Sequence, residues 1–143
     1  KIKAYGFLYR NPTSSLLLMD YFAVISTDRN MGYGSMFLKL LKENLKNFGG
    51  ILVEVEKIEK AKDKIEVKTR ERRLQFYLKN GLVQTNVSCA LFTVDYDILY
   101  LPLKNKYDDK IIYVELEKIY SSMVPKGLYN KNVNLRLEMD LNK

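Results

Sequence analysis

The segment from Arg29 to Gly34 reads Arg-Asn-Met-Gly-Tyr-Gly, between an apolar run and an amphipathic one. Glycines have no Cβ, so consecutive backbone N–H groups near Gly32 and Gly34 can turn toward one point. A helix that begins there adds the positive end of its dipole. The pattern therefore predicts a phosphate or pyrophosphate site. It lacks the Lys-Ser/Thr pair of a P-loop and the third glycine of a Gly-x-Gly-x-x-Gly motif, which disfavours both of those sites.

Three carboxylates are candidates for a general base. Glu54 and Glu56 share one face of the run at residues 51–56, because side chains alternate along a strand. Ligands bind at the C-terminal ends of strands in open α/β sheets. Glu56 lies nearer that end and is the first choice, and Asp20, alone in its apolar run, is the rival. For each of them the alternative is a structural carboxylate bonded to the backbone or to a neighbouring cation.

The cysteine and histidine content excludes several classes of enzyme. The chain has one cysteine and no histidine, so an intrachain disulfide and the usual zinc and triad sites are not expected. Cys89 lies in the apolar stretch 87–94. We expect it to be a buried structural thiol, and we expect no metal site.

The strands and helices are predicted from apolar periodicity and turn signals. Residues 3–9 and 16–25 predict a hairpin. The second strand is apolar on both faces, which is typical of a central strand. Its predicted faces are Leu16, Leu18, Phe22 and Val24 on one side and Leu17, Met19, Tyr21, Ala23 and Ile25 on the other.

After the glycine loop, apolar residues recur at helical spacing and predict a helix of about fourteen residues, stopped by Gly49-Gly50. Residues 51–56 then form a strand, so strand, loop, helix and strand make a βαβ unit with parallel strands. A second helix is predicted at 66–79, strands at 82–84, 87–94 and 96–103, and a last helix at 111–123. The tail at 130–143 is weakly patterned and is expected to be partly mobile.

Length and composition fit a single domain at residues 1–143, with its core at 4–103 and a C-terminal helix and tail at 110–143. The net charge of +7 predicts an anionic partner. Basic residues are scattered, which disfavours nucleic acid. One cluster, at Lys68, Arg70, Arg72 and Arg73, is expected to be a solvated helix face, with the alternative that one or two of these residues approach phosphates of the bound ligand. No segment is apolar enough for a membrane span and no signal-peptide pattern is seen, so we expect a cytoplasmic protein.

Two motifs follow one another along the chain, Arg29-x-x-Gly32-x-Gly34 and Arg73-x-x-Phe76-Tyr77-x-x-x-Gly81-Leu82. In residues and in order they closely resemble the motifs of the GNAT superfamily of acyl-CoA N-acyltransferases. The resemblance covers residues 4–103. It implies an α/β (α+β) fold, with a mixed, largely antiparallel sheet whose central parallel strand pair is splayed at a bulge and flanked by helices. It also implies an enzyme that moves an acetyl group from acetyl-CoA to a primary amine by direct attack in a ternary complex.

The resemblance assigns roles to particular residues. Tyr77 matches the tyrosine that points at the coenzyme A sulfur, and a phenol can protonate a thiolate leaving group. Backbone N–H groups of Phe22, Ala23 and Val24 would bind the pantetheine amides and the oxyanion. The pyrophosphate would be bound by Arg29 and by the backbone of Asn30, Met31, Gly32, Tyr33, Gly34 and Ser35.

The chain departs from the family pattern at its N-terminal side. The strand and helices that usually precede the position of Lys1, and that form one wall of the acceptor site, have no counterpart here. We therefore expect a trimmed product or completion by another chain. A GNAT-like module that binds acyl-CoA or a partner without turnover is the second hypothesis, a homodimer is left open, and the amine acceptor is not readable from the sequence.

Overall fold

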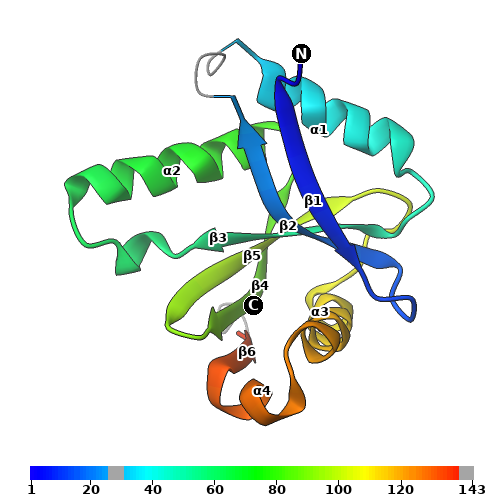
Figure 1. The fold of residues 1–143 in the computed structure, drawn as a ribbon, viewed down its shortest axis with the longest axis vertical. Coiled ribbons are helices and arrows are strands. Elements are labelled where there is room, and N and C mark those ends of the chain that lie inside the picture. The colour runs from blue at the N-terminus through cyan, green and yellow to red at the C-terminus, as the bar shows by residue number, and fades with distance from the viewer. Residues whose placement is uncertain (26–30, 139–143) are drawn as a thin grey trace.

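The computed structural model describes residues 1–25 and 31–138. Among them, one six-stranded sheet has the order β1-β2-β3-β5-β4-β6, and only the pair β2–β3 is parallel. Figure 1 shows this twisted sheet with helices at opposite sides. The strands are β1 (Ala4–Arg10), β2 (Leu16–Val24), β3 (Gly50–Glu56), β4 (Val83–Leu91), β5 (Val94–Pro102) and β6 (Val133–Leu137). The predicted mixed α/β fold with a parallel central pair is confirmed.

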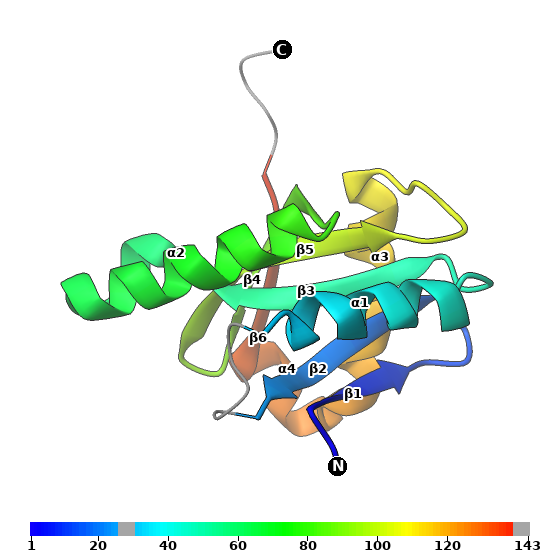
Figure 2. The ribbon, with the colours of Figure 1, turned by 90° about the horizontal axis from the view of Figure 1, so that it is seen from above.

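Helices cover both faces of the sheet. They are α1 (Tyr33–Asn44), α2 (Lys64–Lys79), α3 (Asp109–Met123) and α4 (Lys126–Asn132), with a short 3₁₀ helix η2 (Ile58–Lys60) before α2. Leu38 of α1 and Tyr77 of α2 pack in one core cluster with Leu17 and Val53. Ile112, Leu116 and Ile119 of α3 pack in a second cluster with Leu18. Figure 2 shows α1 and α2 on the near side of β3 in that view.

A β-bulge interrupts β2 at Asp20. On one side of it Leu8 pairs with Met19, and on the other Phe7 pairs with Tyr21, so Asp20 is the extra residue. A bulge shifts the alternation of side chains by one position. Phe22 consequently packs in the same cluster as Leu17 and Met19, and the predicted grouping of Phe22 and Val24 with Leu16 and Leu18 is wrong. The sequence pattern assumed strict alternation through the strand.

The C-terminal tail is more ordered than predicted. Residues Lys126–Asn132 form α4, and β6 follows at Val133–Leu137 and pairs with β4. Polar residues alternate with apolar ones in β6, and five residues are too few to give a clear periodic signal. The prediction for 139–143 lies outside the described residues.

Most other helix and strand boundaries differ from the predicted ones by one to three residues. The second helix begins at Lys64 because the Asp63 side chain accepts a hydrogen bond from the Glu66 N–H, and Asp108 caps α3 in the same way through Ile111. Predicted strands 82–84 and 87–94 are one strand, β4, with an irregularity between Gln84 and Ser88. The first helix ends at Asn44 rather than at the glycine pair, and Gly50 instead begins β3.

Candidate active site

The parallel strands β2 and β3 separate halfway along their length. Their ladder runs from Leu16–Gly50 to Met19–Val53 and stops there, although β2 continues to Val24 and β3 to Glu56. The bulged residue Asp20 follows Met19 directly. In Figure 1 the two strands form a V that opens toward their C-terminal ends. This divergence is the one predicted from the sequence resemblance.

The separation leaves backbone groups of β2 without a strand partner. The Ile25 N–H donates to the Lys3 oxygen, on the β1 side, at 2.9 Å. Because N–H directions alternate along a strand, the N–H groups of Phe22 and Val24 point away from β1, toward the opening. The Ala23 N–H points toward β1. Of the three residues predicted to offer amides to a ligand, two are oriented for it.

The N-terminus of α1 stands at the open end of the V. Gly32 precedes the helix with φ 81, the left-handed region that glycine adopts without strain, and no side chain caps the helix. The first-turn N–H groups, including those of Tyr33 and Ser35, have no intrahelical acceptor. Gly34 is buried, and a Cβ there would lie 2.9 Å from the Phe76 ring. Arg29 and Asn30, predicted pyrophosphate ligands, lie outside the described residues.

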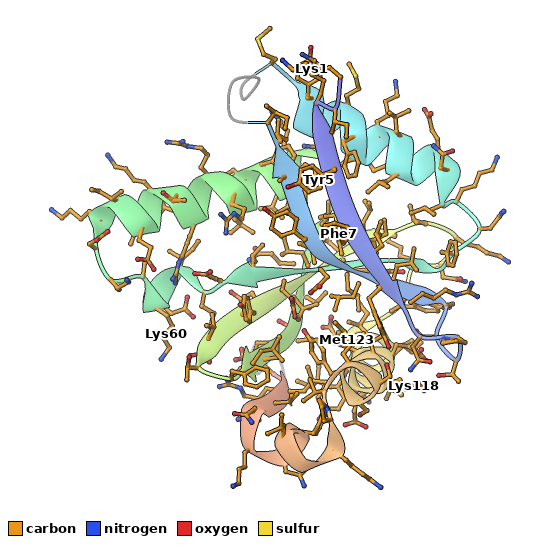
Figure 3. All side chains as sticks on the ribbon, viewed as in Figure 1. Lys1, Tyr5, Phe7, Lys60, Lys118 and Met123 are labelled. Carbon is orange, nitrogen blue, oxygen red and sulfur yellow. The ribbon has the colours of Figure 1, made fainter. Side chains whose placement is uncertain are left out.

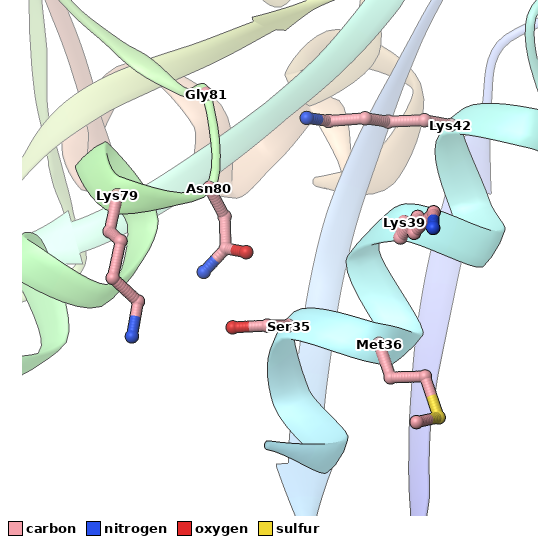
Figure 4. A pocket seen from close by; sticks show the side chains of 7 residues that line it. All are labelled: Ser35, Met36, Lys39, Lys42, Lys79, Asn80 and Gly81. Atoms are coloured by element: carbon pink, nitrogen blue, oxygen red, sulfur yellow. The ribbon is translucent and has the colours of Figure 1, made fainter.

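A lysine-lined pocket of about 590 Å³ lies between α1 and the end of α2. Figure 4 shows its lining residues on the two helices, with Ser35 near Asn80 and the lysines around the opening. They are Ser35, Met36, Lys39, Lys42, Lys79, Asn80 and Gly81. Sequence reasoning placed only Ser35 in a site. The sequence signal for the pocket was the three-residue spacing of Lys39 and Lys42, which places both side chains on the same side of α1.

Tyr77 is buried on the α1–α2 side of the sheet. It has 6% exposure and belongs to the core cluster that also contains Met19, Val53 and Val55. Burial raises the pKa of its phenol, and the Arg73 charge partly opposes that increase. The Tyr77 hydroxyl therefore carries its proton at neutral pH, as a general acid requires. Within the described residues it forms no hydrogen bond, so its proton is not committed to another acceptor.

Glu54 lies on the opposite, α3 side of the sheet. Its Oε2 accepts a short hydrogen bond from the hydroxyl of Tyr120 on α3, a residue outside the range of the resemblance. Burial raises the pKa of Glu54, the Tyr120 hydrogen bond lowers it, and the Asp20 charge raises it. A half-buried carboxyl with a raised pKa and no cation beside it is typical of a base.

Glu56 has a different environment. Its Oε2 lies 2.6 Å from Nη2 of Arg70. The same Nη2 also pairs with Glu66, and Nη1 of Arg70 donates a hydrogen bond to the Lys57 carbonyl at 2.5 Å. Arg70 was predicted to be solvated, but its side chain is 11% exposed, and that part of the prediction is wrong. Helical spacing alone did not reveal it, because the partner Glu56 lies on a distant strand. The ion pair with Arg70 favours the alternative that Glu56 is a structural carboxylate bonded to a neighbouring cation.

Asp20 and three aromatic side chains lie near the bulge. Asp20 is exposed and close enough to Glu54 to raise its pKa. Tyr5, Phe7 and Tyr21 are exposed by 40%, 62% and 50%, with ring centroids 5.8 to 6.1 Å apart. Tyr5 and Phe7 lie along β1 beside β2 in Figure 3. These rings are on the α3 side, since Tyr9 in the same alternation bonds Ser122 of α3.

Cys89 is the buried thiol that was predicted. It has no exposed surface, and burial raises its pKa to about 12. A protonated thiol of this kind is a poor nucleophile. No helix among residues 1–25 and 31–138 is long and apolar enough to cross a membrane.

The splayed parallel pair, the bulge, and a helix that begins at the open end define the GNAT acetyltransferase fold, and this chain has that fold. Solved structures confirm the assignment. One is the ribosomal-protein-S18-alanine N-acetyltransferase of Escherichia coli, with 15% identity, a TM-score of 0.53, and coverage of 75% of this chain and 65% of that one. Another is a Bacteroides thetaiotaomicron protein assigned to the GNAT family, with 18% identity, a TM-score of 0.60, and coverage of 90% and 64%.

A third similar structure is a Bacillus subtilis acetyltransferase in complex with CoA, with 15% identity, a TM-score of 0.54, and coverage of 72% of this chain and 70% of that one. The chain spans less than two thirds of the length of the first two structures. The sequence matches no protein-family model and no curated protein. At these identities the likeness establishes the fold.

Proposed function

We propose that the chain is an acyl-CoA-dependent N-acyltransferase that moves an acetyl group from acetyl-CoA to a primary amine. The observation that carries the proposal is the divergence of β2 and β3 after Met19 and Val53. It brings together, at one opening, unpaired backbone amides and the N-terminus of α1. Similar folds have been solved with CoA and with acetyl coenzyme A.

Coenzyme A is a polyanion, and the proposed site has the matching charge. Its pyrophosphate would lie at the uncapped N-terminus of α1, near Gly32 and Gly34. Its remaining phosphate would be bound near Lys39, Lys42 and Lys79 in the neighbouring pocket. The pantetheine arm would pair with the amides of Phe22 and Val24.

The chemical groups are distributed over the two sides of the sheet. Glu54, with Asp20 beside it, would take the proton of the acceptor ammonium, and the free amine would attack the thioester carbonyl. The backbone amides of β2 would stabilise the oxyanion of the tetrahedral intermediate. As the carbon–sulfur bond breaks, Tyr77 would give its proton to the departing thiolate, and the second proton of the attacking nitrogen would be lost to solvent, from which Tyr77 regains a proton. No covalent enzyme intermediate is required, which fits a chain without histidine and with an inert Cys89.

The names of the similar structures do not identify the amine acceptor of this chain. The E. coli structure is named for a ribosomal protein alanine and another for nourseothricin, so the fold serves chemically different amines.

The test is a thermal shift assay followed by a product screen. Acetyl-CoA should raise the Tm of the intact protein, and Gly34→Glu should abolish that increase. Mass spectrometry of an amine library incubated with acetyl-CoA should then show products that disappear with Tyr77→Phe. No shift would refute the proposal, and a shift without products would favour the acyl-CoA-binding module.

A further inference from the structure

Helix α3 places a tyrosine hydroxyl against the candidate base. Tyr120 is 2% exposed, and its hydroxyl donates a short hydrogen bond to Oε2 of Glu54, across the core from β3. Because the phenol has a single proton, the contact with Cys89 Sγ at 3.5 Å is one in which the protonated thiol donates to the Tyr120 oxygen. A chain of donors thus runs from Cys89 through Tyr120 to Glu54.

The other described elements around Glu54 place no cation in an ion pair with it. Asp20 faces it from β2, Tyr96 interacts with it from β5, and Cys89 interacts with it from β4. Among the ion pairs of the described residues none includes Glu54. Tyr120 is therefore the group that favours the ionised carboxylate, against burial and the Asp20 charge.

The hydrogen bond also determines the orientation of the carboxyl group. Oε2 is occupied by Tyr120, whereas Oε1 has no hydrogen-bond partner among the described residues. Tyr120 itself is held by α3, whose Ile112, Leu116 and Ile119 have exposures of 1% or less. A ring fixed in this way has few alternative rotamers.

We infer that Tyr120 is a positioning residue for Glu54: its O–H holds Oε2, keeps the carboxyl group ionised and oriented, and leaves Oε1 to accept the ammonium proton. This inference rests on the proposed function, with Glu54 as the base. It extends the reaction machinery into α3, beyond the segment that resembles the GNAT family.

The experiment compares Tyr120→Phe with the intact protein in two measurements. In the first, the Glu54 carboxyl is titrated by carbon-13 NMR in the full chain, which needs no turnover. Loss of the hydrogen bond should raise the Glu54 pKa by about one unit, as expected for a hydrogen bond to a charged group. In the second, the acidic limb of the pH profile of kcat/KM should move to higher pH by the same amount, with the lost activity regained as the pH rises.

Tyr113→Phe is the matched control. It removes a hydroxyl from the same helix, and within residues 1–25 and 31–138 that hydroxyl donates one hydrogen bond, to the Leu135 carbonyl at 3.5 Å. Its pH profile should not move. The KM for acetyl-CoA should be unchanged in both variants.

The outcomes separate this inference from the proposed function. An unmoved Glu54 titration in Tyr120→Phe would overturn the inference while acetylation continues. A moved titration with an unmoved kcat/KM profile would also overturn it, because Tyr120 would then act on a carboxylate that is not the base. Absence of acetylated product from the intact protein would instead contradict the proposed function.

Discussion

Met19 and Val53 are the last partners of the parallel ladder, and the chain beyond each of them no longer pairs with the other strand. Tyr77 belongs to the same core cluster as both residues, on the α1–α2 side. Glu54 follows Val53 directly, and its side chain contacts Tyr120 on the other side. The opening therefore joins two faces of the sheet, one with the proposed acid and one with the proposed base.

Gly34→Ala should weaken both the fold and the binding of coenzyme A. The added Cβ would lie 2.9 Å from the Phe76 ring, and overpacking of this kind costs about 1–3 kcal/mol. Thermal unfolding with and without acetyl-CoA measures both effects. Gly127→Ala is the control, because nothing lies within 4 Å of a Cβ there, and its Tm should not fall. Equal Tm values for the two variants would contradict the close contact.

Tyr77→Phe should reduce kcat by about 100-fold, the lower range for general acid catalysis. The ring and its packing remain, so the KM for acetyl-CoA and the Tm should change little. Because burial raises the Tyr77 pKa above its usual value of 10.0, the wild-type acid should stay protonated through pH 9. A loss of activity at pH 8 to 9 that disappears in Tyr77→Phe would disagree with this assignment.

Glu54→Gln and Glu56→Gln should have opposite effects. Burial raises the pKa of Glu54, so the ionised carboxylate is unfavourable in the folded protein. The free energy of unfolding therefore falls as the pH rises through the pKa of Glu54 in the unfolded chain and then through its higher pKa in the folded protein. Glu54→Gln should thus raise the Tm at pH 8 while it removes activity. Glu56→Gln breaks the ion pair with Arg70 and should lower the Tm with activity retained. The reverse pattern would return Glu56 to the role of base.

Charge reversal in the lysine-lined pocket should weaken cofactor binding. Lys39→Glu with Lys42→Glu should raise the KM for acetyl-CoA at least about fivefold, because charged groups are removed from a phosphate. The effect should shrink at high salt, since exposed charges are screened. Lys46→Glu with Lys104→Glu reverses the same number of charges outside the pocket and serves as the control. A KM increase of equal size there would indicate a general charge effect.

Cys89 should be inert in the folded protein and should make stability fall in alkali. Its pKa is about 12 in the folded protein, against an ordinary value of 9.0, so the unfolded chain loses the thiol proton first. The free energy of unfolding therefore decreases as pH rises from 9 toward 12. Cys89→Ala should flatten this decrease in denaturant titrations at pH 8 and 10. Rapid reaction of the native thiol with a disulfide reagent at pH 8 would contradict the burial.

The local pattern of the sequence predicted the parts of the fold that depend on short-range signals. The apolar run at residues 16–25, the glycine loop and residues 51–56 predicted a parallel pair around a helix, and that unit is present. The bulge was implied only by resemblance. Its position at Asp20 depends on pairing with β1, and no periodic pattern in β2 alone contains that information.

The site was less predictable because its environments are made by distant segments. The choice between Glu54 and Glu56 depends on Tyr120 and Arg70, which come from α3 and α2. Alternation placed both carboxylates on one face, but it did not show which of them has a cation as a neighbour. The same limit applies to the pocket, which is lined by Lys42 of α1 and Lys79 of α2.

The extra residue Asp20 divides β2 into two halves, and the alternation of side chains between the two sheet faces is offset by one position from one half to the other. Odd-numbered positions before Asp20, Leu17 and Met19, and even-numbered positions after it, such as Phe22, belong to the same core cluster. Deletion of Asp20 would therefore remove the bulge and restore regular alternation, with Tyr21 directly after Met19 and with Tyr21 and Phe22 on their present faces. A scan of polar substitutions along β2 should show its sensitive positions switch from odd to even at residue 20.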